Sequence, residues 1–360
     1  LVAAAERPVL VTFRVGRRPG GTAAVTRLAD LAAMPVVGQP EAVNVASDHP
    51  MARIGADEGT SLLEQADVVL VVESDVPWIP RRTRLAPGAR VVHIDPDPVH
   101  ASMPLWTYPV DVAATADGAI ALSQLADALE ERRAGSGPAW EERRDRLDTG
   151  RRTERSGDAP RPAPNNGEPG DAPLRPADVL GVLAELLDPE DVVVEEAVTN
   201  AGAVAAHLPR SRPGTLTSAG GPGLGWALGA SVGLRMARPD RRVVAVVGDG
   251  SFMFGVPTAA LCLAAEAQAP FVAVILDNDG YRASRLPVLS LFPEGPSAAA
   301  GDAVGTRFRQ PPDFAAVAEA CGALGRTVQD EAGLRQALEE AFAAVAGGRA
   351  AVLDVRIERG

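Results

Sequence analysis

The sequence predicts an α/β protein of two domains, each a three-layer α/β/α arrangement around a mainly parallel sheet. Short β-branched and apolar runs alternate with amphipathic stretches of helix length, which is the pattern of repeated strand–helix–strand units. The chain has 360 residues, more than one ordinary α/β domain requires. Because residues 134–174 are rich in Gly, Pro, Asn and Arg, we predict a first domain at 1–133, a linker at 134–174 with a short helix near 141–147, and a second domain at 175–360.

The first domain shows strands and helices in regular alternation. Strands are predicted at 8–13, 34–37, 67–72 and 90–94, and helices at 20–33, 61–66 and 118–132. The turn RVGRRPGG at 14–21 contains glycines, but not in the G-x-G-x-x-G spacing that binds dinucleotides in Rossmann-like domains. Dinucleotide binding at this turn is therefore not expected.

The second domain begins with a helix whose first position is Pro176. Strands are predicted at 191–194, 243–247, 271–276 and 351–357, and further helices up to about 236 and at 251–268, 313–321 and 331–346. Residues 282–312 contain several Arg, Pro and Gly and are interpreted as a long loop, of the kind that often forms a lid or a binding loop.

Composition excludes several classes of function. The formal net charge of −12 argues against a nucleic-acid-binding surface. All 35 basic residues are Arg, so neither Schiff-base nor P-loop lysine chemistry is available to this chain. Cys262 and Cys321 lie in apolar helical patterns without disulfide or metal spacing and are expected to be buried. No run is apolar enough for a membrane span and no signal-peptide pattern opens the chain, so a cytoplasmic protein is expected.

The most informative stretch, residues 241–281, places oxygen ligands at two strand ends. The strand at 243–247 ends in Gly248-Asp249-Gly250-Ser251, and the strand at 271–276 ends in Asp277-Asn278-Asp279-Gly280. Ligands bind beyond the carboxyl ends of parallel strands, and the N–H groups at Gly250 and Ser251 suit a phosphate. Asp249, the Asn278 amide oxygen and a carbonyl near Gly280 form an oxygen-only set suited to Mg²⁺ bridging protein and diphosphate. For GDG alone, an ordinary structural turn is the alternative.

The complete order of strand, GDGS, helix, Pro270, strand and DN-x-GY resembles the diphosphate-binding motif of thiamine diphosphate (ThDP) enzymes, in the acetolactate synthase and benzoylformate decarboxylase branch. The resemblance implies the ThDP-binding fold for the second domain and the family's central domain for the first. It implies that Asp249, Asn278 and the carbonyl of Gly280 bind Mg²⁺. The cofactor-binding positions that it implies here are Gly248, Asp249, Gly250, Ser251, Asn278, Gly280 and Tyr281. Two departures are Asp277, where relatives often carry Asn, and a slightly longer helix between the strands.

Two further segments gain a role from the same resemblance. Thr199 and Asn200 follow the strand at 191–194 and are interpreted either as helix N-caps or as diphosphate contacts. The stretch TSAGGPGLGWALGA at 217–230 is either a flexible loop before a packed helix or the family's Gly-Gly-Leu-Gly loop. In the second case Gly223 contacts the cofactor, and Leu224 wedges between the two rings of ThDP and holds it bent.

The resemblance covers only two of the family's usual three domains. The activating Glu of these enzymes belongs to an amino-terminal pyrimidine-binding domain and is contributed across a subunit interface. We therefore assign no catalytic residue in this chain and expect a fragment, or one subunit of a split enzyme. The central domain carries FAD in some members and nothing in many, and nothing is expected here.

Three functions remain open. The first is a ThDP- and Mg²⁺-dependent decarboxylase or carboligase, acetolactate-synthase-like, acting on a 2-oxo acid and completed by a pyrimidine-binding domain or subunit in a homo- or hetero-oligomer. The second is a non-catalytic cofactor-binding or scaffold subunit. The third, a nicotinamide-dependent oxidoreductase, is disfavoured by the missing glycine fingerprint. Neither a nucleic-acid nor a membrane partner is expected.

Overall fold

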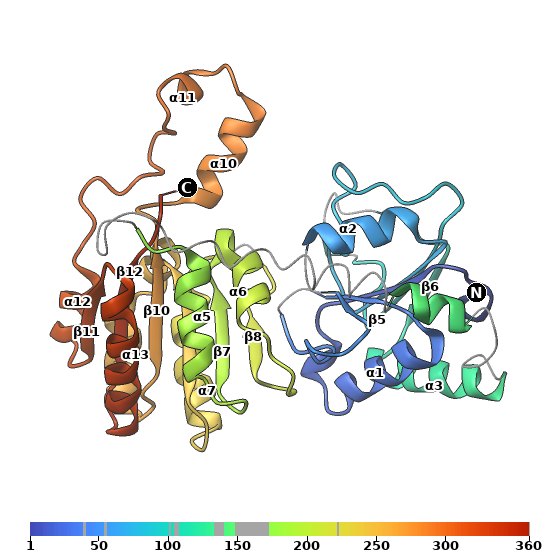
Figure 1. Cartoon of the computed structure of the whole chain (residues 1–360), viewed down its shortest axis with the longest axis horizontal. Coiled ribbons are helices and arrows are strands. Elements are labelled where there is room, and N and C mark those ends of the chain that lie inside the picture. Colours follow the sequence, from blue (N-terminus) through green and yellow to red (C-terminus); the bar gives the residue numbers. More distant parts are fainter. Residues whose placement is uncertain are drawn as a thin grey trace. The chain divides into compact units, whose positions relative to one another are not determined.

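The computed structural model describes residues 1–38, 41–53, 56–100, 102–103, 108–132, 140–147, 173–221 and 223–359 (Figure 1). The chain divides into two compact units, Leu1–Pro164 with Arg210–Thr215, and Asn165–Pro209 with Leu216–Gly360. The short helix expected in the linker is present at 140–147. The rest of the predicted linker, apart from residues 173 and 174, lies outside the described residues. None of the described helices is long and apolar enough to cross a membrane.

The first unit contains a six-stranded, all-parallel sheet with strand order β3-β2-β1-β4-β5-β6. Its strands are β1 (Pro8–Thr12), β2 (Val36–Gly38), β3 (Ala52–Arg53), β4 (Val68–Val72), β5 (Arg90–Asp95) and β6 (Val112–Thr115). Its helices are η1 (Val2–Ala4), η2 (Val15–Arg17), α1 (Gly21–Ala32), α2 (Ala56–Gln65) and α3 (Gly118–Glu131). The sequence does not predict β3 and β6, because β3 has two residues and β6 is largely exposed.

Alternate side chains of the first sheet face opposite helix layers. Leu10 of β1 belongs to the core cluster that contains Leu28 of α1 and Leu122 of α3. Its neighbour Val11 belongs to the cluster on the other face, with Leu63 of α2. Strands covered on both faces are apolar throughout, which is why they appear in the sequence as continuous apolar runs.

The second unit contains another six-stranded, all-parallel sheet, with strand order β11-β12-β10-β9-β7-β8. Its strands are β7 (Val192–Glu196), β8 (Leu216–Ser218), β9 (Val243–Gly248), β10 (Val272–Asp277), β11 (Leu324–Val328) and β12 (Ala351–Arg356). Its helices are α5 (Pro176–Leu186), η3 (Val198–Asn200), α6 (Ala201–His207), α7 (Trp226–Ala237), α8 (Asp249–Phe254), α9 (Pro257–Glu266), α10 (Arg282–Leu291), α11 (Pro296–Ala299), α12 (Phe314–Ala320) and α13 (Glu331–Ala346).

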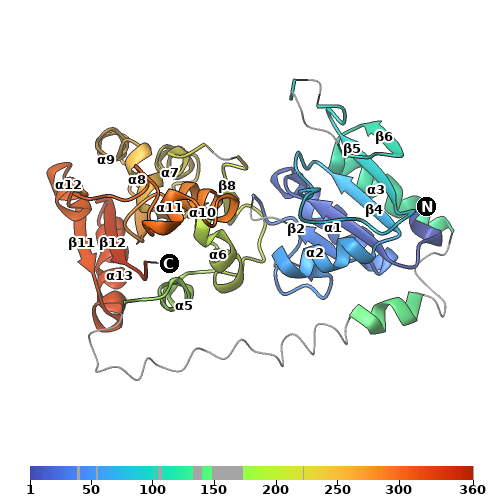
Figure 2. The same ribbon diagram turned by 90° about the horizontal axis from the view of Figure 1, so that it is seen from above.

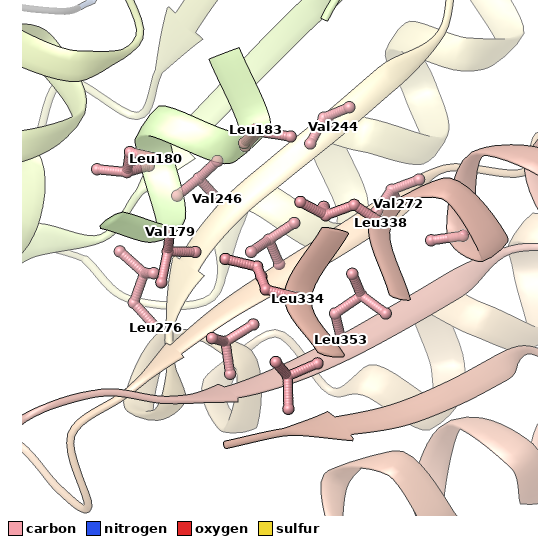
Figure 3. Packing of buried hydrophobic residues seen from close by; sticks show 14 of the residues in the cluster. Val179, Leu180, Leu183, Val244, Val246, Val272, Leu276, Leu334, Leu338 and Leu353 are labelled. Carbon is pink, nitrogen blue, oxygen red and sulfur yellow. The ribbon is translucent and has the colours of Figure 1, made fainter. Parts of the chain in front are cut away.

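Helices cover both faces of the second sheet (Figure 2). Figure 3 shows the side on which α5 and α13 pack, where Val246 and Leu276 are buried with Leu180 and Leu334. On the other face, Ile275 lies in the cluster formed with α7, α8, α9 and α12. The predicted fold class, two three-layer α/β/α units with parallel sheets, is confirmed.

Three expectations about the second unit are wrong. Residues 282–312 contain α10 and α11, and α10 escaped prediction because Pro287 lies inside it, where proline ordinarily interrupts a helix. The helical stretch after Ser251 is two helices, since α8 ends at Phe254 and Pro257 begins α9. Cys262 is exposed, because α9 turns other residues toward the core. Cys321, at the end of α12, is only half-buried.

Candidate functional site

The Asp249 carboxylate joins the two glycine-containing motifs at the carboxyl edge of the second sheet. It is 2% exposed and accepts hydrogen bonds from the main-chain N–H groups of Gly250 (2.7 Å) and Gly280 (2.7 Å). β9 and β10 are parallel neighbours, so their carboxyl ends lie at the same edge. The structure therefore brings Asp249 and Gly280 together, with the half-buried Asn278 on the turn just before Gly280.

Burial and a neighbouring acid make the Asp249 carboxyl group electrostatically unusual. Desolvation and the charge of Asp277 raise the pKa of Asp249 to about 7, although the N–H donors of Gly280 and Gly250 oppose this shift. A divalent cation bound at this carboxylate would offset both the lost hydration and the repulsion from Asp277.

The donor set around Asp249 fits a magnesium ion. The Asp249 oxygens keep lone pairs beyond the two hydrogen bonds that they accept, and Asn278 offers an amide oxygen. The Gly280 carbonyl accepts the Arg282 N–H at 3.0 Å, which leaves its second lone pair for a ligand. No group of three or more His, Cys, Asp or Glu side chains in the described part of the chain is arranged to hold a metal. That finding is compatible with this set, which contains only one such side chain.

Tyr281 and Ser251 hold the first turn of α8 in place, directly after the extended Gly248. A Cβ atom on Gly250 would lie 2.6 Å from Cε1 of Tyr281, so only glycine lets the ring lie against this turn. The Ser251 hydroxyl donates to the main-chain oxygen of Glu196 at the end of β7 (2.8 Å). The Ser251 hydroxyl proton is therefore engaged, and its main-chain N–H, in the first helical turn, is the group that a ligand at this edge could accept.

Glu196 also fixes the start of α7, a role that the sequence analysis missed. Its carboxylate accepts the main-chain N–H groups of Gly225 (2.7 Å), Trp226 (3.1 Å) and Ala227 (2.9 Å). A carboxylate at a helix N-terminus is stabilising because it satisfies unpaired N–H groups and complements the helix dipole. An acid at a strand end that precedes a glycine-rich helix start is the signal from which this contact was predictable.

The glycine-rich loop that precedes α7 contacts β7 on one side and α8 on the other through Gly225. Gly225 has a φ of 97°, and a Cβ atom there would lie 2.4 Å from the carbonyl oxygen of Phe254, the last residue of α8. Only glycine permits this approach. Leu224, half-buried, and Gly223, exposed, immediately precede Gly225. The predicted loop residues therefore lie next to the helix that starts at Asp249.

Thr199 and Asn200 lie in η3, just beyond the end of β7. Asn200 is buried but makes no side-chain cap on α6, so the alternative of an N-cap at Asn200 is wrong. Its Nδ2 atom is buried without a hydrogen-bond partner. An unpaired buried donor is costly, and an anionic ligand at this edge would satisfy it. α10 contacts η3 and lies beyond the carboxyl ends of the strands (Figures 1 and 2).

Replacing Glu196 by alanine is expected to destabilise the second unit and to loosen the glycine-rich loop. Three main-chain donors lose their acceptor, which we expect to cost about 1–3 kcal/mol. Glu196→Gln keeps one acceptor oxygen and should lose clearly less. Denaturant unfolding of both variants measures the difference, and equal stability of Glu196→Ala and the wild type would contradict the contact.

Glu195→Gln is expected to stabilise the protein increasingly as pH rises from 4.5 to about 7, and fully above pH 7. Burial, with a further contribution from the charge of Glu196, raises the pKa of Glu195 from 4.5 to about 7, despite the hydrogen bond from the Ala197 N–H. The folded state then holds a proton that the unfolded state releases, so stability falls as pH rises from 4.5 to about 7. Above pH 7 the glutamine variant should be more stable by on the order of 3 kcal/mol, and near pH 4 the two proteins should be alike. Parallel curves of unfolding free energy against pH would contradict this.

Comparisons with known proteins agree with this geometry. The family model of the thiamine pyrophosphate enzyme central domain matches residues 1–125, and that of the C-terminal TPP binding domain matches residues 197–355. Benzoylformate decarboxylase of Pseudomonas aeruginosa is 32% identical over 291 residues, which cover 79% of this chain and 48% of that protein. Acetolactate synthase of Mycobacterium leprae is 26% identical over 352 residues, which cover 95% of this chain and 54% of that protein.

Solved structures show the same fold. A thiamine diphosphate-dependent 4-hydroxybenzoylformate decarboxylase of Rhodococcus jostii has a TM-score of 0.75 at 24% identity over 100% of this chain and 63% of its own. Benzoylformate decarboxylase of Polynucleobacter necessarius has a TM-score of 0.75 at 23% identity with the same coverage. The chain spans about half the length of the curated relatives that it matches.

Proposed function

Since the chain belongs to the thiamine pyrophosphate enzyme family, we propose that its second unit holds the diphosphate of ThDP through Mg²⁺ at Asp249, Asn278 and the Gly280 carbonyl. The observation that carries this proposal is the hydrogen bond from the Gly280 N–H to Asp249 (2.7 Å), which joins the two motifs at one edge of the sheet. The raised pKa of Asp249 supports it, because a buried acid beside a second acid favours a bound cation.

We infer that the remaining predicted positions bind the cofactor itself. Main-chain N–H groups at the start of α8, together with Thr199 and the unpaired Nδ2 of Asn200, surround the diphosphate side. Gly223 and Leu224 contact the rings, because the contact of Glu196 with Gly225 fixes the end of their loop. Gly248, Gly250 and Tyr281 shape the turn that the diphosphate approaches.

The reaction that we propose is decarboxylation of a 2-oxo acid, with or without transfer of the remaining fragment to a second carbonyl compound. The bound cofactor supplies the electron sink for decarboxylation, and the protein supplies binding, orientation and exclusion of water. In this chain Asp249 and Asn278 anchor the cofactor, while Leu224 and Tyr281 provide apolar walls. P. aeruginosa benzoylformate decarboxylase and M. leprae acetolactate synthase support this reaction class.

A pyrimidine-binding domain outside these 360 residues is proposed to complete the site, in a homo- or hetero-oligomer in the cytoplasm. Large apolar side chains of the second unit are exposed around the start of α7, the end of α8 and α10. They include Trp226, Met253, Phe254, Val256, Leu291 and Phe292. Phe254 is 58% exposed and Phe292 63% exposed, and large apolar side chains that are this exposed favour a protein partner over water.

Calorimetric titration of the chain with ThDP tests the binding proposal. We expect heat of binding with Mg²⁺ present and none when EDTA replaces it. Binding of NAD without any response to ThDP would contradict the proposal and favour the oxidoreductase. ThDP binding without turnover, even after a pyrimidine-binding domain is added, would favour the non-catalytic cofactor-binding or scaffold subunit.

A further inference from the structure

A guanidinium group lies directly behind the candidate metal site. Arg356 of β12 is the register partner of Asp277 on β10. Its Nη1 atom lies 2.5 Å from Oδ2 of Asp277, and its Nη2 atom lies 2.8 Å from Oδ2 of Asp354. The side chains of Asp277 and Asp354 are 1% and 0% exposed, whereas that of Arg356 is 36% exposed. One cation at the rim thus faces two buried carboxylates.

Asp277 connects this ion pair to the proposed metal ligand. β10 lies between β9 and β12, and after burial the charge of Asp277 is the largest contribution that raises the pKa of both Asp249 and Asp354. Three buried acids therefore form a row across the ends of β9, β10 and β12, which we call the acidic row. Like charges this close repel strongly away from water, and buried charges persist only when they are paired.

The contacts of Arg356 act through charge rather than through aligned hydrogen bonds. Oδ2 of Asp277 and both carboxylate oxygens of Asp354 are buried and have no hydrogen-bond partner, although the Arg356 nitrogens lie close to them. The guanidinium therefore compensates the charge of the acidic row without the directed fork geometry that arginine offers. Another positively charged side chain of similar length, such as lysine, should therefore perform the same function at position 356.

We propose that Arg356 is a positioning residue for the metal site: a permanent counter-charge that holds the acidic row together before a divalent cation binds at Asp249. The proposal rests on the proposed binding of Mg²⁺ at that residue. Removing the Arg356 charge should destabilise the metal-free protein more than the metal-bound protein, because Mg²⁺ then supplies the missing positive charge. Arg356 consequently lowers the affinity of the site for Mg²⁺, and it keeps the acidic row in place in the metal-free protein.

The test compares Arg356→Gln with the charge-keeping Arg356→Lys and with the double variant Asp277→Asn/Arg356→Gln. Melting temperatures are measured in EDTA and with saturating Mg²⁺ and ThDP. In EDTA we expect Arg356→Gln to melt roughly 5 °C below the wild type. The rise in melting temperature that Mg²⁺ and ThDP produce should be larger in Arg356→Gln, and titration should show a roughly three- to tenfold higher affinity for Mg²⁺.

The other two variants separate charge from packing. In Arg356→Lys, Mg²⁺ and ThDP should raise the melting temperature by as much as in the wild type. In EDTA, the double variant should melt at the wild-type temperature, because it lacks one acid as well as the cation. A purely structural role for Arg356 would lower the melting temperature equally in EDTA and in Mg²⁺. That result, or a smaller increment in Arg356→Gln than in the wild type, would overturn the proposal.

The same experiment distinguishes failure of this proposal from failure of the proposed function. If wild-type protein gains no stability from Mg²⁺ and ThDP, Asp249 is not a metal ligand and both proposals fail. If the wild type gains stability but Arg356→Gln shows the same increment, the metal site stands and only the role of Arg356 is refuted.

Discussion

Asp249→Asn is expected to abolish Mg²⁺-dependent ThDP binding while the second unit stays folded. Asparagine loses the negative charge that attracts the cation but keeps an oxygen that accepts the Gly280 N–H, now accepted by Asp249 at 2.7 Å. Altering groups around a metal commonly costs 10–100-fold in affinity, and we expect removal of a charged ligand to cost more than about 100-fold. Titration of ThDP in Mg²⁺ measures this loss.

The choice of asparagine follows from the burial of Asp249, which is 2% exposed. Alanine at this position would leave the buried Gly280 N–H without an acceptor and would mix a folding defect with the binding defect. Asparagine also removes the repulsion between Asp249 and Asp277, so unfolding stability in EDTA should not fall. Asp240→Asn is the matched control, because this exposed acid pairs with Arg238 in the turn before β9, at the opposite end of the same strand. Unchanged ThDP affinity in Asp249→Asn would remove this residue from the metal site.

The 360-residue chain by itself is expected to release no CO₂ from 2-oxo acids, even with ThDP and Mg²⁺ bound. Activation of the cofactor needs a properly placed acid, and the acids described at this edge are already engaged. Glu196 accepts three main-chain N–H groups, and Glu195 is buried with a hydrogen bond from Ala197. Asp249 is the proposed metal ligand. Addition of a pyrimidine-binding domain should restore turnover.

A panel of 2-oxo acids, assayed for CO₂ release with and without a candidate pyrimidine-binding partner, measures this dependence. The Asp249→Asn variant with the same partner is the control, because any CO₂ that it releases does not depend on the proposed metal site. Robust release by the chain alone would show that an activating group lies within these residues and that the proposed division of labour is wrong. If the partner stimulates CO₂ release by the wild type but not by Asp249→Asn, the result would support both the metal site at Asp249 and the need for a pyrimidine-binding domain.

Local patterns were sufficient to predict the strands that carry the site. β9 and β10 are covered by helices on both faces, so Val243–Gly248 and Val272–Asp277 appear in the sequence as apolar runs with polar turns after them. Helix α10 was not predicted, because Pro287 within it and the Arg and Gly residues that follow indicated a loop. Pro257, which separates α8 from α9, was visible in the sequence but was not used.

By itself the sequence determined the α/β class, the two carboxyl-end motifs and the residue types able to hold Mg²⁺ and diphosphate, because these depend on neighbours along the chain. Only the tertiary structure decided which distant groups meet at that edge. Glu196 reaches Gly225 across 29 residues, and Arg356 reaches Asp277 because β12 lies beside β10. Strand order follows from how the whole sheet buries its apolar surface, so no local pattern could identify the cation paired with Asp277. The acid at the end of β7 was visible in the sequence, but only the structure shows that Glu196 accepts the N–H groups at the start of α7.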